Sequence, residues 1–182
     1  LFKERQKKLQ EEGLFDEQYK KELPFLPKKI GVITSPTGAV IMDIMDRINA
    51  RFPTPIELYP ASVQGINSSK EIIAGVKHFN ESKSVDVLII ARGGDGPEDF
   101  MGFNEEALVR EVYASEVPII SAIGHETDFT LLDYVSDWRA ATPTAAAERA
   151  VPERVILVKN LKNIFDNLST SIIYYFKKIN KD

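Results

Sequence analysis

Residues 117–128 read Val-Pro-Ile-Ile-Ser-Ala-Ile-Gly-His-Glu-Thr-Asp, an apolar run that stops at a glycine and continues as four polar or titratable residues. A short apolar run bounded by glycine is typical of a buried strand, and the glycine frees the backbone for a turn. His125 is one of only two histidines in the chain. The stretch therefore predicts a buried strand over residues 117–123 that ends in a candidate active-site loop.

Short apolar segments of this kind alternate with helical segments through residues 28–150. The expected strands are residues 30–34, 56–61, 85–91 and 117–123, and the expected helices are residues 38–51, 68–81 and 103–114. Because crossovers between parallel strands are right-handed, this alternation predicts a mostly parallel sheet with helices on both faces. The expected fold class is α/β, a three-layer domain flanked by an N-terminal linker helix and a C-terminal long amphipathic helix.

The segment before this domain is dense in Lys, Glu and Gln, which predicts a solvated helix over residues 1–23, broken near Gly13 and ended by Pro24 and Pro27. We expect residues 1–27 to be a linker helix from a missing N-terminal domain. The alternative is an exposed helix that packs on its own domain.

The segment after the domain, residues 151–182, carries apolar residues spaced mostly by alternating threes and fours. This spacing predicts the start of a coiled-coil-like helical region that packs on a partner helix. An amphipathic helix folded back on its own domain is the alternative.

Composition sets the broad class. The chain is 43% hydrophobic with a net charge of −4 and no cysteine. That charge excludes nucleic-acid binding by bulk electrostatics but not by a local site, and the lack of cysteine excludes disulfides and thiolate metal sites. No membrane span and no signal peptide are visible, so we expect a cytoplasmic protein.

Three loops are expected to meet at one edge of the sheet, because the carboxyl ends of parallel strands face the same way and ligands of open α/β sheets bind there. They are residues 34–38, 92–96 and 124–128. The first is rich in hydroxyls, and Ser35 or Thr37 is expected to cap the following helix before Gly38. A helix N-terminus in such a turn also suits a phosphate.

The helix over residues 38–51 has one predicted core face, formed by Val40, Ile41, Ile44, Met45 and Ile48. Asp43 lies off that face, with Arg47 one turn later. Periodicity alone makes Asp43 a solvated ion-pair partner of Arg47.

In the second loop, Arg92 directly follows an apolar run, and Gly93 and Gly94 permit close approach of a ligand. The planar guanidinium of an arginine donates paired hydrogen bonds to phosphate. The alternative is a structural ion pair of Arg92 with Glu98 or Asp99.

In the third loop, His125 and Asp128 are three residues apart, and we expect them to lie close together if Thr127 caps a short helix. A carboxylate beside an imidazole fixes its tautomer and raises its basicity. The alternative is a hydrogen-bonded turn histidine. His78 falls on the polar side of its helix and is expected to be exposed.

Five stretches together resemble the large subunit of exodeoxyribonuclease VII, in the same order along nearly the whole chain. They are residues 28–39, the Arg92-Gly93-Gly94 loop with Glu98-Asp99, Phe103-Asn104-Glu105, residues 124–128, and residues 142–148 with Thr142 and Pro143 as a helix N-cap pair. Where the family usually has Gly-Gly-Gly-Ser-Leu-Glu-Asp-Leu, this chain has Asp95, which adds a negative charge, and Pro97, which stiffens the turn.

The resemblance implies a nuclease that degrades single-stranded DNA to short oligonucleotides without an obligatory divalent metal. It implies four catalytic residues, Asp43, Arg92, His125 and Asp128. Substrate contacts are expected from Ser35, Thr37, Gly38, Gly93, Gly94 and Thr127. It also implies an OB-fold before residue 1 and a small subunit that binds the C-terminal helical region, so part of the function is expected to lie outside this fragment.

The resulting hypothesis is phosphodiester hydrolysis in which His125 is the general acid or base and Asp128 orients it. Arg92 neutralises charge on the phosphoryl oxygens. Asp43 and Asp128 beside a histidine equally suit Mg2+. Two other functions are compatible with the residues. The Gly93 to Gly96 loop is similar to the phosphate loop of NAD kinases and diacylglycerol kinases, and the helical tail suits a non-catalytic assembly scaffold.

Overall fold

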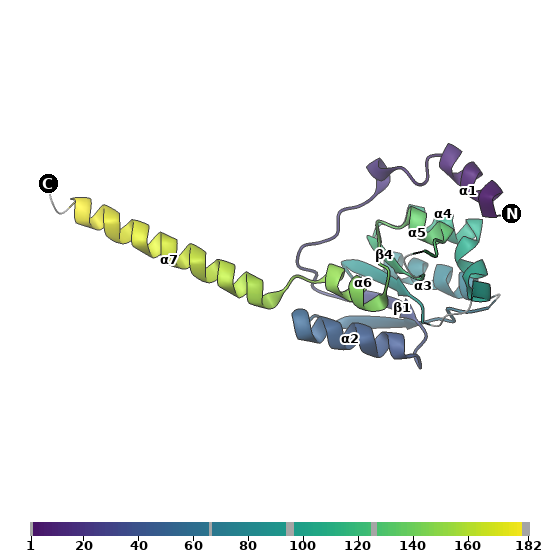
Figure 1. Ribbon diagram of the computed structural model, residues 1–182, viewed down its shortest axis with the longest axis horizontal. Coiled ribbons are helices and arrows are strands. Elements are labelled where there is room, and N and C mark those ends of the chain that lie inside the picture. The colour runs from purple at the N-terminus through teal and green to yellow at the C-terminus, as the bar shows by residue number, and fades with distance from the viewer. Residues whose placement is uncertain (1, 66, 94–96, 125–126, 180–182) are drawn as a thin grey trace.

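The computed structural model describes residues 2–65, 67–93, 97–124 and 127–179, with the backbone alone for residues 97–99. In this part of the chain five parallel strands form one sheet in the order β2-β1-β3-β4-β5 (Figure 1). The strands are β1 (Ile30–Thr34), β2 (Ile56–Pro60), β3 (Val87–Ala91), β4 (Ile119–Ala122) and β5 (Trp138–Arg139). The predicted parallel sheet is confirmed.

Helices cover both faces of the sheet, as expected for right-handed crossovers (Figure 1). One face packs against α2 (Ala39–Arg51) and α6 (Pro143–Ala150). The other packs against α3 (Ser68–Ser82), α4 (Glu106–Ala114) and α5 (Leu131–Val135). The three-layer α/β class is therefore confirmed.

Alternation along each strand divides the core between these two layers. In β3, Val87 and Ile89 belong to the core shared with α2, whereas Leu88 and Ile90 belong to the core shared with α3. Successive strand side chains point to opposite faces, so a strand buried on both faces reads as an unbroken apolar run. The loops that follow the strands then emerge together at the carboxyl edge.

Some boundaries and one strand differ from the sequence-based expectation. The chain after β3 forms a 3-10 helix, η2 (Pro97–Asn104), so α4 begins at Glu106 instead of residue 103. The short strand β5 was not predicted. Met45, expected in the core, is exposed, because at about 100° per residue it lies at the margin of the stripe that α2 buries.

The N-terminal segment packs on the domain. Leu9 of α1 (Phe2–Glu11) is fully buried, and Arg5 and Lys8 form ion pairs with Glu105 and Glu106 at 3.1 and 2.9 Å. The helix ends before Gly13, whose φ of +80° suits glycine. The predicted N-terminal helix is present and packs on this domain, followed by the short helix η1 (Glu17–Tyr19); its role as a linker stays a prediction.

The C-terminal segment is the helix α7 (Arg154–Ile179), which confirms the predicted helical tail. It extends away from the sheet (Figure 1), and none of its described residues is buried. It therefore does not fold back on this domain, which contradicts that alternative. Across the residues that the structure describes, the helices lack the length and hydropathy that a membrane span requires.

Candidate active site

A cavity of about 270 Å3 opens at the carboxyl edge of the sheet, where the loops after β1, β3, β4 and β5 converge. Its described lining is Ala39, Val40, Asp43, Arg92, Gly93, Ala122, Ile123, Gly124, Ala141, Thr142 and Pro143. The cavity thus brings together predicted site residues from helix α2 and from the loop after β3. Asp43, Arg92 and Gly93 share one space despite their separation in the sequence.

The N-terminus of α2 faces this cavity through Ala39 and Val40. Gly38, not Ser35 or Thr37, is the N-cap residue, and no side chain caps the helix. The two hydroxyls lie 3.4 Å from each other instead. The expected side-chain cap is therefore wrong, and the first-turn N–H groups and the positive end of the helix dipole remain available to an anion.

A second helix N-terminus, that of α6, lines the same cavity. Thr142 is its N-cap, with its hydroxyl accepting a hydrogen bond from the Ala145 N–H at 3.0 Å, and Pro143 occupies the first turn. The predicted cap is confirmed. Sequence reasoning missed its place in the site, because only β5 puts this helix start at the carboxyl edge.

Arg92 lies at the base of the cavity and is 3% exposed. Its backbone N–H donates to the Ala122 carbonyl at 3.0 Å, and its guanidinium carbon lies 4.3 Å from the centre of the Phe100 ring. A buried arginine keeps its charge, so it favours an anionic ligand. The side chains of Glu98 and Asp99, the alternative partners, lie outside the described set.

Gly93 and Gly124 are needed for close packing around the cavity. A Cβ on Gly93 would lie 2.5 Å from Cγ2 of Val40, and one on Gly124 would collide with the Asp128 carbonyl oxygen. Gly94, the third glycine predicted in these loops, lies outside the described residues. The strand ends therefore approach α2 and residue 128 more closely than a side chain permits.

The histidine loop is described only in part, because His125 lies outside the described residues. Thr127 and Asp128 are exposed, and the described lining of the cavity includes neither. Thr127 does not cap the next helix. Thr130 does, in a reciprocal capping box with Asp133. The proximity of His125 and Asp128 stays a prediction.

Asp43 is exposed and lies off the core face of α2, as predicted. The expected ion pair with Arg47 is absent among the described residues, since Arg47 pairs with Glu148 of α6 at 3.3 Å. Asp43 is therefore not committed to that structural pair, and it faces the cavity that also holds Arg92.

Asp133 is a buried carboxylate that sequence reasoning missed. It accepts hydrogen bonds from the hydroxyls of Ser121 and Thr130 at 2.7 and 2.8 Å. Arg139 Nε lies 3.9 Å away, and Nη2 of the same arginine donates to the Asp128 carbonyl at 3.4 Å. Asp133 thus links β4 and β5 to the loop that carries Asp128.

Asn104, from the stretch Phe103-Asn104-Glu105, joins two of the site loops. Its Oδ1 accepts a hydrogen bond from the Leu131 N–H at 2.8 Å, and its Nδ2 donates to the Phe100 carbonyl at 3.2 Å. Asn104 therefore ties η2, which carries Phe100 beneath Arg92, to the start of α5. Its role is to position loops.

Among the described residues, no group of three or more His, Asp or Glu side chains is arranged to hold a metal ion. His125 is not one of these residues, so this observation does not test the Mg2+ alternative.

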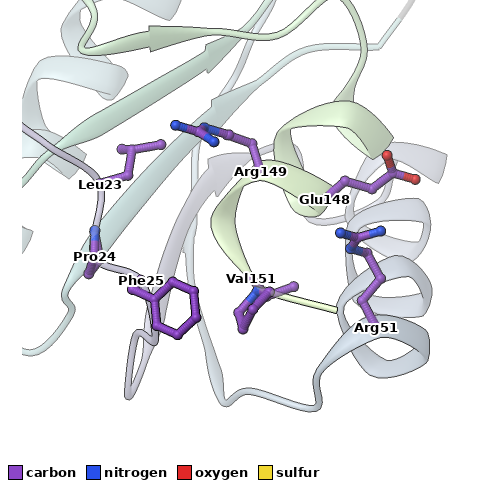
Figure 2. Close-up of a pocket in the computed structure, with 8 residues that line it drawn as sticks. Leu23, Pro24, Phe25, Arg51, Glu148, Arg149 and Val151 are labelled. Atoms are coloured by element: carbon purple, nitrogen blue, oxygen red, sulfur yellow. The ribbon is translucent and has the colours of Figure 1, made fainter. Parts of the chain in front are cut away.

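A different cavity, of about 330 Å3, lies at the C-terminal ends of α2 and α6. Figure 2 shows Leu23, Pro24 and Phe25 on one side of it and Arg51 and Glu148 on the other. Both arginines that line it interact with other residues of the protein. Arg51 lies 3.7 Å from Glu153, and Arg149 stacks at 4.0 Å on the Trp138 ring. None of the predicted site residues lines this cavity.

Comparisons with known proteins identify the family to which the chain belongs. A family model described as "Exonuclease VII, large subunit" matches residues 14–182. An exodeoxyribonuclease 7 large subunit of Bartonella henselae is 54% identical over 182 residues, which are 97% of this chain and 38% of that protein. One of Halothermothrix orenii is 46% identical over 177 residues, 97% of this chain and 44% of that protein.

This chain therefore spans less than half the length of the curated relatives it matches. Among solved structures, an ABC transporter solute binding protein of Bacillus halodurans aligns at 28% identity over 52% of this chain and 30% of that chain. Its TM-score is 0.33, too low to bear on fold or function. The match of the family model to residues 14–182 and the two relatives show that this chain belongs to the exonuclease VII large subunit family.

Proposed function

We propose that this chain is the catalytic module of a nuclease that hydrolyses phosphodiester bonds of single-stranded DNA to short oligonucleotides. The observation that carries the proposal is the cavity in which Asp43, buried Arg92 and the N-termini of α2 and α6 meet. A guanidinium and helix N-terminal N–H groups are donors suited to phosphoryl oxygens. Because the chain belongs to a nuclease family, we infer that the anion bound at this site is a phosphate of a nucleic acid.

In the proposed reaction a water oxygen attacks phosphorus, and the bond from phosphorus to the leaving sugar oxygen breaks. Arg92 and the two helix N-termini neutralise the charge that develops on the phosphoryl oxygens. His125, oriented by Asp128, accepts the proton of the water or donates one to the leaving oxygen, and Asp43 positions the water. Proton transfer and charge neutralisation each contribute about two to four orders of magnitude in rate.

We further propose that Ser35, Thr37, Gly38, Gly93, Gly94 and Thr127 contact the substrate, that no divalent metal is obligatory, and that the protein acts in the cytoplasm. We assign α7 to the binding of a small subunit, supported by the many apolar side chains that this helix leaves exposed. Membership of the large-subunit family favours the nuclease over a nucleotide-phosphorylating enzyme.

The test of the activity uses the full-length large subunit assembled with its small subunit. We expect degradation of a labelled single-stranded oligonucleotide both with Mg2+ and in excess chelator. Complete loss of cleavage in chelator would overturn the metal-free mechanism and leave the nuclease assignment standing. No degradation under either condition, with stabilisation by a nucleotide on heating, would favour the phosphorylating alternative.

The two histidines form a matched pair for mutation. We expect His125→Ala to lower kcat by at least about a hundredfold, because general acid-base catalysis is lost. His78→Ala should leave kcat unchanged, since His78 is exposed on α3 beside Glu57, away from the cavity. Equal activity of the two variants would remove His125 from the mechanism. Full biological function of His125→Ala would favour the assembly scaffold.

A second matched pair concerns the guanidinium. Arg92→Lys keeps the charge but loses the planar fork, so we expect a drop in kcat/KM of about tenfold or more. Arg47→Lys, at an exposed position paired with Glu148, is the control and should retain activity. An Arg92→Lys enzyme as active as that control would show that the cavity is not the phosphate site.

A further inference from the structure

A groove of about 440 Å3 lies at the N-terminal turns of α3 and α4, beside η2. We name it the α3–α4 groove. Its lining residues are Gly65, Ser69, Lys70, Ile73, Met101, Gly102, Glu105 and Ala107. It is on the face of the sheet opposite to α2 and α6, but at the same carboxyl edge as the candidate active site.

The walls of the groove are apolar and its polar groups are few. Met101 is 71% exposed, and Ile73 and Ala107 also line the groove. Ser69 is 6% exposed, and its hydroxyl has no hydrogen-bond partner among the described residues. Apolar walls with a few polar groups suit a flat heteroaromatic ring with polar edge atoms.

The groove is built on the same loops as the active-site cavity. Gln64, next to groove residue Gly65, donates from Nε2 to the Gly93 carbonyl at 3.3 Å. On η2, Phe100 packs against the Arg92 guanidinium, while its neighbour Met101 faces the groove. The chain that supports Arg92 on one side therefore forms a wall of the groove on the other.

The rim of the groove is suited to a phosphodiester backbone. Lys70 adds a positive charge, and the negative charge of Glu105, which also lines the groove, is paired with Arg5 at 3.1 Å. α3 begins at Ser68 without a side-chain cap from Asn67, and the Ser68 N–H donates to the Gly65 carbonyl at 3.3 Å. The hydrogen bond from Gln64 to Gly93 places this rim beside the loop that carries Arg92. The size, apolar walls, Ser69 hydroxyl and rim charge together match one nucleotide.

We propose that the α3–α4 groove is a nucleobase subsite, which takes one unpaired base of the strand whose phosphate lies beside Arg92. This inference rests on the proposed function and assigns residues that the cleavage step does not use. A paired base is held in its stack and costs a few kcal/mol to extract, whereas a base of a single strand enters freely. The groove therefore selects single strands by the shape of their bases.

The test combines substrate and protein changes in the assembled full-length enzyme. Fluorescein-labelled oligothymidylates with cleavage-resistant phosphorothioate linkages carry one abasic residue at successive positions, and their Kd is measured by anisotropy. Ala107→Trp fills the groove. Its matched control is Ala114→Trp, the same substitution at the exposed far end of the same helix. Unmodified oligonucleotides are assayed for cleavage in parallel.

We expect one abasic position to raise the Kd of the wild type about tenfold, the effect typical of losing one bound base. Ala107→Trp should raise the Kd of the intact strand by a similar factor and abolish the difference between intact and abasic strands, while Ala114→Trp changes neither. The subsite is overturned if the Kd is the same for every position of the abasic residue, or if Ala107→Trp and Ala114→Trp change the Kd equally. Absent cleavage with the expected binding pattern overturns the proposed function and leaves the subsite standing.

Discussion

Asp133 shows how much one buried side chain contributes to this site. We predict that Asp133→Asn lowers the free energy of unfolding by about 2–3 kcal/mol, because charge-assisted hydrogen bonds are lost and Arg139 loses a buried counter-charge. Urea unfolding measures this loss. Asp46→Asn, at an exposed position on α2, is the control and should stay within about 0.5 kcal/mol of the wild type. Similar values for the two variants would contradict the buried network.

Single residues were predictable where the sequence alone dictates their surroundings. Arg92 follows an unbroken apolar strand, and Asp43 lies off the apolar stripe of its helix, so both could be placed before the structure was known. Asp133 was missed because its partner Ser121 is twelve residues away. One local signal was present, since Thr130 followed three residues later by Asp133 has the spacing of a capping box.

At the scale of elements, Glu106 helps to dock α1 on α4, together with buried Leu9 and the ion pair of Arg5 with Glu105. Glu106 accepts hydrogen bonds from Lys8 at 2.9 and 3.0 Å and from Arg110 at 2.8 and 2.9 Å. These bonds, that of Lys8 first, hold the pKa of Glu106 below its ordinary value of 4.5. The stabilisation they give is complete above that value and is lost as the pH falls through the lower pKa of the folded protein.

We therefore predict that Glu106→Gln destabilises the protein at pH 7 and that the difference from the wild type shrinks to nothing as the pH falls below 4.5 and through the lowered pKa. Unfolding midpoints measured across this range test the prediction. The control is Glu81→Gln, on α3, which should show a small difference that does not depend on pH in this way. A constant difference for Glu106→Gln down to pH 3 would rule out the linkage.

Strands and helices differed in how well the sequence predicted them. β1, β3 and β4 are short, mostly apolar strands buried on both faces, so their pattern does not depend on distant residues. β5 has only two residues, neither of them buried, and it exists because it pairs with Ile120 and Ser121. Without that strand, the start of α6 could not be placed at the cavity.

At the scale of the whole molecule, α7 contributes nothing to the core. We predict that a chain ending after residue 153 has a free energy of unfolding within about 1 kcal/mol of that of the full 182-residue chain, because no buried contact is lost. We also predict that it self-associates less in solution, because exposed apolar surface is removed. Thermal unfolding and size-exclusion chromatography measure both effects.

The control truncation ends after residue 140 and also removes α6, whose Ala146, Ala147 and Ala150 belong to the core. It should not unfold cooperatively. If the chain ending after residue 153 behaved in the same way, α7 would have to be part of the domain's folding unit.

The overall architecture followed from the alternation of strands and helices, and the convergence of the loops followed from their parallel arrangement. What the sequence does not encode locally is which surface each flanking helix covers. The contacts of Arg5 and Lys8 with Glu105 and Glu106 span about a hundred residues, so only the folded chain shows that α1 packs on α4.

The separation between α7 and the cavity determines whether proteins bound along α7 could block access to the cavity. α6 begins at the carboxyl edge and ends at the opposite edge, where α7 departs (Figure 1). A helix of 26 residues is about 39 Å long, enough for partners to sit in a row along it. Proteins bound along α7 would therefore lie away from the carboxyl edge of the sheet, where the candidate site opens. The DNA strand of the proposed function would then reach the cavity without crossing α7 or anything bound to it.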